Sequence, residues 1–172
     1  MNKSNEINNL PKIPRLLALP LRFIPHQLHS TALATFLNRI LAEPLREGEL
    51  DFLRRRVLLI RVSDAQLNFC LTLIGDRLVA RHHKLPHDLS IEGTAYDFLL
   101  LATRREDPDT LFFNRRLRLG GSTELGLYVK NFLDSLEPQE LLGPLFKHLE
   151  QMTHLFEKMG RFQSGVRFRQ AM

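Results

Sequence analysis

The sequence predicts an α+β fold in which helices cover one face of an antiparallel sheet of about five strands. Three observations carry this expectation. Helical periodicity occupies both ends of the chain, short apolar runs separated by turn residues fill 57–93, and one further run, RLRLGG, lies between later helical stretches. The expected order is helices, four strands, two helices, one strand and two helices, which suits a sheet with one covered face.

The first helical stretch spans residues 26–43, and Pro44 is expected to end it. Its apolar stripe consists of Leu33, Phe36, Leu37, Ile40 and Leu41. From Val57 the runs VLLIRV, LNFCLTLIG, RLVARHH and DLSIEG predict strands, with a tight hairpin at Gly75-Asp76. We expect these four strands to form an antiparallel meander. One alternating set of side chains should form its buried face: Leu67, Phe69, Leu71 and Leu73.

Three later helices carry start signals. Thr94 is a plausible N-cap for TAYDFLLLATRR, Asp107 followed by Pro108 begins another helix, and Ser122 or Thr123 caps the next. A last helix is expected from Pro138 to about Met159, followed by a basic, mobile tail after Gly160. Its apolar seam favours packing on its own domain over self-association, although both remain open; the seam is Leu142, Leu145, Leu149, Met152, Phe156 and Met159.

Length and composition indicate one domain with extensions. The 172 residues divide into an N-terminal segment, 1–44, a central domain, 45–135, and a C-terminal helix and tail, 136–172. A net charge of +5 and a pI of about 9.8 favour an anionic partner, either nucleic acid or a membrane surface. The single cysteine, Cys70, lies in an apolar run, so we expect an inert buried thiol and a cytoplasmic protein.

The segment from Leu10 to Pro25 combines apolar and basic residues but is interrupted by prolines and too short to span a bilayer. This pattern predicts shallow docking on an anionic membrane, and thus peripheral membrane association. The alternative is packing on its own domain or on a second copy. The docking residues are expected to be Arg15, Leu16, Leu17, Leu19, Leu21, Arg22, Phe23 and Ile24.

The sequence offers little support for catalysis, a metal site or a cofactor. His82 and His83 are adjacent on an expected strand and so point to opposite faces, and GGSTELG lacks the lysine and glycine spacing of a phosphate-binding loop. We therefore expect a protein that is not an enzyme. Basic clusters at 54–56, 104–105 and 115–118 leave a nucleic-acid-binding module as the alternative, but they lack interleaved exposed aromatics. A membrane-facing or solvated basic surface is favoured.

Residues 106–137, EDPDTLFFNRRLRLGGSTELGLYVKNFLDSLE, resemble the UbiT (YhbT) family, which carries a lipid-binding domain of the type-2 sterol carrier protein class. The blocks DPDTLFF, RRL and TELGLYVKN match most closely, and a looser likeness covers 45–135. The resemblance implies a sterol-carrier-like fold and an accessory role in oxygen-independent ubiquinone biosynthesis. The implied ligands are polyprenyl quinone precursors or phospholipid, and the implied partners are the UbiU and UbiV hydroxylase proteins.

The resemblance implies no catalytic residues, but it does point to residues that line a lipid pocket or pack beneath it. The matched motif contributes Leu111, Phe112, Phe113, Leu117, Leu125, Leu127, Tyr128 and Val129. The strand face 67–73, together with Phe98 and Leu101, completes the expected site. We expect the pocket between the sheet and the helices at 94–104, 107–113 and 122–135.

Overall fold

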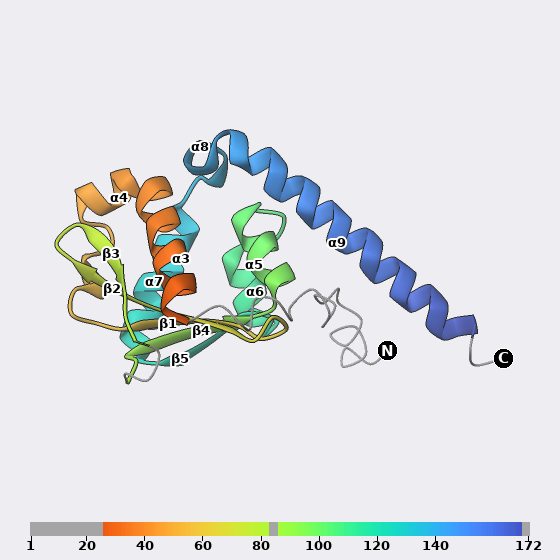
Figure 1. The fold of residues 1–172 in the computed structure, drawn as a ribbon, viewed down its shortest axis with the longest axis horizontal. Coiled ribbons are helices and arrows are strands. Elements are labelled where there is room, and N and C mark those ends of the chain that lie inside the picture. The colour runs from red at the N-terminus through yellow and green to blue at the C-terminus, as the bar shows by residue number, and fades with distance from the viewer. Residues whose placement is uncertain (1–25, 83–85, 170–172) are drawn as a thin grey trace.

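The computed structural model describes residues 26–82 and 86–169, and it confirms the α+β class, with the helices gathered on one side of a five-stranded sheet (Figure 1). The first elements are α3 (His26–Ile40), α4 (Ala42–Glu47), the 3₁₀ helix η1 (Asp51–Leu53), β1 (Leu58–Val62), β2 (Leu67–Ile74), β3 (Arg77–Ala80) and β4 (Leu89–Gly93). There follow α5 (Ala95–Ala102), α6 (Pro108–Phe113), β5 (Arg118–Gly121), α7 (Thr123–Ser135), α8 (Pro138–Leu142) and α9 (Pro144–Arg169).

The sheet has the strand order β3-β2-β1-β4-β5, and it is mostly antiparallel. The expected four-strand meander is wrong at its last step, because β4 pairs with β1 in the parallel direction instead of with β3. The contacts of Asp88 explain this placement. Its carboxylate accepts a hydrogen bond from the Val57 N–H at 2.8 Å, and its own N–H donates to the Val57 carbonyl at 2.9 Å. These bonds set the start of β4 beside the start of β1.

The hairpin between β2 and β3 is confirmed, with Ile74 paired to Arg77 across Gly75-Asp76. Gly75 has φ +59°, which is the positive value that the first central residue of a type II′ turn requires. On the outer edge of β3, the Asn38 side chain of α3 bonds both the N–H and the carbonyl of Leu78 at 2.8 Å. The amide thus imitates a neighbouring strand and closes an edge that would otherwise be open to association.

The three predicted helix starts are confirmed. Thr94 and Asp97 form a capping box at α5, in which each side chain bonds the other residue's backbone N–H. Asp107 accepts from the Thr110 N–H at the start of α6, and Ser122 accepts from the Leu125 N–H at the start of α7. In each case a short polar side chain replaces the hydrogen bond that the first turn of a helix cannot make internally.

Two helix boundaries differ from expectation. The first helix ends at Ile40, and Pro44 lies in the first turn of α4, where its missing N–H costs no intrahelical bond. The expected last helix is two helices, because Gly143 takes φ +49° after α8 and Pro144 then begins α9. The backbone of α9 continues through Gly160 to Arg169, so the expected end of the helix near Met159 is wrong.

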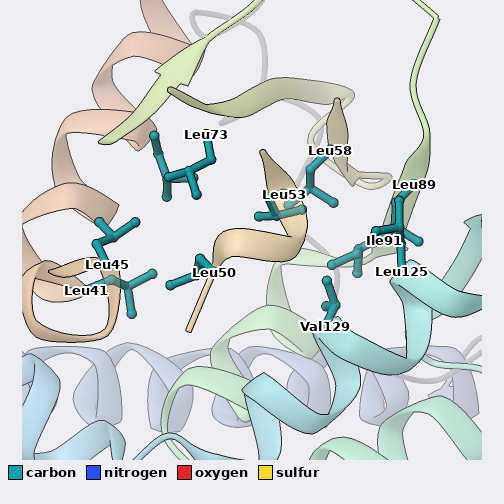
Figure 2. Close-up of a cluster of buried hydrophobic side chains, with 11 residues drawn as sticks. Leu41, Leu45, Leu50, Leu53, Leu58, Leu73, Leu89, Ile91, Leu125 and Val129 are labelled. Atoms are coloured by element: carbon teal, nitrogen blue, oxygen red, sulfur yellow. The ribbon is translucent and has the colours of Figure 1, made fainter. Parts of the chain in front are cut away.

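The hydrophobic core lies between the covered face of the sheet and the helices above it. Figure 2 shows its leucine side chains converging from α4, η1, the sheet and α7. Its buried members are Leu41, Leu45, Leu50, Leu53, Leu58, Leu73, Leu78, Leu89, Ile91, Leu125 and Val129. All eleven are hydrocarbon side chains, and they lie in the region in which a lipid site is expected.

Candidate functional site

The apolar interior joins the sheet to the segment α4–η1 and to α7. The sheet contributes Leu58, Leu73, Leu78, Leu89 and Ile91, and the remaining buried leucines and Val129 come from α4, η1, the residues just before them and α7 (Figure 2). Burying one such side chain contributes roughly 1.5–3 kcal/mol. Contacts of this kind are non-directional. A leucine side chain can therefore exchange its contact with another leucine for a contact with a lipid chain, at similar energy.

An aromatic cluster forms a rim between this interior and solvent. Phe52 of η1 stacks on Tyr128 of α7 with ring centroids 5.7 Å apart, and it lies 6.4 Å from Phe132. Phe52 and Phe132 are half-buried and pack against the core, whereas Tyr128 is 47% exposed. The sequence reasoning missed Phe52 and Phe132, although the apolar spacing in ELDFL and along α7 carried the signal.

The expected alternation of a buried and an open face does not hold in β2, because Cys70 and Thr72 of the opposite phase are buried as well. Leu71 and Leu73 are fully buried, and Leu67 and Phe69 are half-buried. The register partners of Leu67, Phe69 and Leu71 in β1 are also apolar, namely Val62, Ile60 and Leu58. On α5, Phe98 is half-buried and packs against the core. Leu101 of the same helix is also half-buried.

The motif residues of α6 and α7 divide between the interior and the surface. Leu111, Leu117, Leu125 and Val129 are buried, and Phe112 is half-buried. Three other motif residues were expected in the interior but are exposed: Phe113 at 85%, Leu127 at 57% and Tyr128 at 47%. Helical periodicity gives the reason in α7, because the positions that follow Leu125 and Gly126 turn away from the buried side.

The expected membrane-docking residues, 15–24, lie outside the described residues. Within the described part of the chain, no helix is long and apolar enough to cross a bilayer, and no group of three potential metal ligands is present. Cys70 is buried, and burial raises the pKa of its thiol, which keeps the sulfur protonated and unreactive.

A charged network lies on the other side of the helical layer. The Arg116 guanidinium donates to Asp97 at 2.8 Å and to Glu106 at 2.7 Å, and it lies 5.6 Å from the Tyr96 ring centre. Asp97 is almost wholly buried and also closes the capping box of α5. Burial, followed by the charge of Glu157, raises the pKa of the Tyr96 hydroxyl. This network fixes the relative positions of α5 and the segment that follows α6.

The same network extends to α9. Tyr96 stacks on Phe156 with centroids 6.3 Å apart, and Arg105 pairs with Glu157 at 3.1 Å. Leu149 and Phe156 of the expected seam are half-buried, whereas Leu145 and Met152 are exposed. The half-buried part of the seam therefore lies on the side of α9 that packs against α5, and self-association stays a prediction.

The basic clusters are largely neutralised by carboxylates. Five of their eight arginines form ion pairs: Arg54 with Asp51 and Asp76, Arg56 with Asp88, Arg104 with Asp134, Arg105 with Glu157, and Arg116 with Asp97 and Glu106. Only Arg55, Arg115 and Arg118 have no such partner among the residues that the structure describes. A nucleic-acid groove needs free cations along its length, so this pairing does not favour one.

Comparison with known proteins agrees with the fold and with the apolar interior. Residues 35–134 match the SCP-2 sterol transfer family. The ubiquinone biosynthesis accessory factor UbiT of Escherichia coli K12 is 38% identical over 144 residues, which cover 84% of this chain and 82% of that protein. The same protein from E. coli O157:H7 gives the same values.

A solved structure described as the UbiJ-SCP2 ubiquinone synthesis protein has the same fold. It superposes with a TM-score of 0.51 at 16% identity, covering 62% of this chain and 94% of that one. The strand order, the covered sheet face and the matched residues are thus those of a sterol-carrier domain. The chain belongs to the SCP-2 sterol transfer family and, within it, to the family of the ubiquinone biosynthesis accessory factor UbiT.

Proposed function

We propose that the chain is a non-enzymatic carrier for a polyprenylated precursor in oxygen-independent ubiquinone biosynthesis. The observation that carries the proposal is the cluster of buried hydrocarbon side chains between the sheet and α4, η1 and α7, found in a chain of the UbiT family. In this proposal, residues 45–135 form the lipid-binding unit, and the isoprenoid tail enters between the sheet and the α4–η1 and α7 side of the helical layer.

The energetics suit a carrier. A buried methylene contributes about 0.8 kcal/mol, so a five-carbon isoprene unit contributes roughly 3–4 kcal/mol relative to water. Transfer from a bilayer compares two apolar surroundings, and its net free energy is therefore small. The protein can therefore take an isoprenoid tail from the bilayer and return it, because binding itself adds no large free-energy barrier. Phospholipid is the second apolar ligand that this interior suits.

The ring of the precursor would lie at the aromatic rim formed by Phe52, Tyr128 and Phe132. Tyr128 is the member that reaches solvent, so a ring beside it remains accessible to another protein. The UbiU and UbiV hydroxylase proteins are the proposed recipients of the ring. The carrier itself contributes no catalytic group and no cofactor, and it works in the cytoplasm with peripheral docking on the membrane through residues 10–25.

Organic extraction of the purified full-length protein, followed by mass spectrometry, tests the proposal. We expect a polyprenyl quinone precursor or a phospholipid in stoichiometric amount. Titration of lipid-stripped protein with a polyprenyl phenol should then restore occupancy and raise the unfolding midpoint. A protein that carries no lipid and is not stabilised by either ligand would exclude the carrier function.

A further inference from the structure

The turn between α6 and β5 is held rigidly at both ends. On one side Leu111 is completely buried, and on the other Arg116 is ion-paired and Leu117 is buried. The backbone closes the turn with bonds from the Arg115 N–H to the Phe112 carbonyl at 3.0 Å and from the Arg116 N–H to the Leu111 carbonyl at 2.9 Å. These two bonds are those of a Schellman motif, so residues 112–115 form a fixed tip.

The tip has an arginine where the motif prefers glycine. Arg115 takes φ +57°, a left-handed conformation that disfavours any residue with a Cβ. The end of α5 offers a matched case, because Arg104 takes φ +51° in the same motif. Arg104 is accounted for there, since its guanidinium bonds the Asp134 carboxylate and the carbonyls of Asp134 and Leu136.

Arg115 has no comparable explanation within the fold. Its side chain is exposed and forms no ion pair or hydrogen bond with any described residue. Two positions before it, Phe113 is 85% exposed, the largest exposure of any large apolar side chain in the described residues. A rigid tip thus combines a strained, unpaired cation with a solvent-exposed aromatic ring, and neither feature stabilises the folded chain.

We propose that this tip inserts into an anionic lipid surface, with the Phe113 ring among the upper acyl chains and the Arg115 guanidinium on a lipid phosphate. The inference rests on the proposed carrier function, which requires access to a bilayer, but it concerns residues 112–115 and not residues 10–25. Arg118, which is also exposed and unpaired, lies three residues further along the chain.

Charge on the neighbouring elements agrees with this partner. Asp109 of α6 is neutralised by Lys130 at 2.9 Å, so the nearest unpaired carboxylate along α6 and α7 is Glu124, in the first turn of α7. One projecting aromatic ring beside cations is the chemistry of an interfacial anchor. A protein-binding surface would instead require a flat apolar centre, and a nucleic-acid site would require several stacking rings.

The absence of tryptophan from the sequence permits a direct test on the full chain. Phe113→Trp places a unique fluorophore at the tip, and Ile74→Trp places one at the β2–β3 hairpin, where Ile74 is 52% exposed. With vesicles of phosphatidylcholine and phosphatidylglycerol, we expect the tip tryptophan to shift its emission to shorter wavelength and to be quenched by brominated lipid. The hairpin tryptophan should show neither effect.

Two variants measure the strength of the contact. Arg115→Gly should weaken partition onto these vesicles about fivefold, the value of one basic contact, and Phe113→Ser about tenfold. Unfolding cannot explain a loss in Arg115→Gly, because glycine is the residue that this backbone position favours. Ile74→Ser, the matched apolar control, should bind as the natural chain does.

The tip proposal is overturned if the chain floats on vesicles while the Phe113→Trp emission is unchanged, or if neither variant loses affinity. A tip that lacks vesicle affinity and instead binds a protein partner or RNA would overturn it as well. Lipid extraction remains an independent test of the carrier function, so the tip proposal can fail while the carrier function stands.

Discussion

The helical layer is joined to the rest of the domain by different forces at its two sides. On the side of α4, η1 and α7, the contacts with the sheet are made by hydrocarbon side chains. On the side of α5, α6 and α9, a network of charges and rings centred on Arg116 and Tyr96 holds the helices together. The two sides differ in how specific their contacts are.

This difference indicates which side can open. An ion pair or a capping hydrogen bond requires one geometry, and it is costly to leave unmade when buried. A leucine contact has no such requirement and can be exchanged for a contact with a lipid chain at little net cost. The charged side therefore serves as the scaffold, and the hydrocarbon side is the one that we propose to admit the isoprenoid tail.

Replacing Asp97, the carboxylate that pairs with Arg116, should change the free energy of unfolding most. Asp97→Ala leaves Arg116 buried without its closest partner and also removes the α5 capping box, so we expect a loss of about 3–5 kcal/mol in the free energy of unfolding. Urea denaturation measures it. The double variant Asp97→Leu with Arg116→Met should recover part of the loss, because no buried charge then lacks a partner. A single variant that loses less than about 1 kcal/mol would contradict the scaffold role.

A matched pair of substitutions within α7 tests the hydrocarbon side. Leu125→Ala removes a buried side chain and should lower the free energy of unfolding by about 2–4 kcal/mol. Leu127→Ala makes the same chemical change on the same helix at an exposed position, and its effect should stay within about 0.5 kcal/mol. Equal losses in the two variants would mean that the buried side of α7 is assigned incorrectly.

A polar anchor beneath the hydrocarbon side makes stability depend on pH. The Val57 N–H, followed by the Arg56 guanidinium, lowers the pKa of the Asp88 carboxyl in the folded state. A lowered folded-state pKa stabilises the fold above the ordinary aspartate value of about 3.9, and this contribution disappears as the pH falls through the lowered value.

The difference between the natural chain and Asp88→Asn isolates this contribution from that of other carboxylates. Asp88→Asn should cost about 1–2 kcal/mol at pH 7, and the difference between the two proteins should shrink below about pH 4. Urea denaturation between pH 3 and 7 measures both curves. A difference that stays constant over this range would show that the charge of Asp88 is not what stabilises the start of β4.

The sequence was sufficient for features that depend on neighbouring residues. Thr94, Asp107 and Ser122 cap their helices as predicted, and Gly75 turns the hairpin, because each acts on a backbone group within three residues. Such signals need no knowledge of the tertiary structure.

Features that depend on distant contacts could not be predicted in this way. The parallel pairing of β4 with β1 is set by Asp88 and Val57, which are 31 residues apart. The outward positions of Leu127 and Phe113 depend on which side of each helix meets the sheet, and an apolar motif does not reveal this. The break at Gly143 was the exception, since a glycine followed by proline is a local signal for the end of one helix and the start of another.

The smallest change in the free energy of unfolding is expected when the arginines at the ends of α5 and α6, Arg104 and Arg115, are replaced with glycine. Both occupy the left-handed position of a Schellman motif, so replacing either with glycine removes the same backbone strain, worth about 1 kcal/mol. At Arg115 nothing offsets this gain, and Arg115→Gly should raise the free energy of unfolding by about 0.5–1 kcal/mol.

At Arg104 the gain is cancelled by the loss of bonds to Asp134 and to the end of α7, so Arg104→Gly should be neutral or destabilising. Thermal and urea denaturation of the two variants side by side measure the difference. If Arg115→Gly is the less stable of the two, Arg115 has a structural role in the fold. If it is the more stable, the fold alone does not account for an arginine at this position.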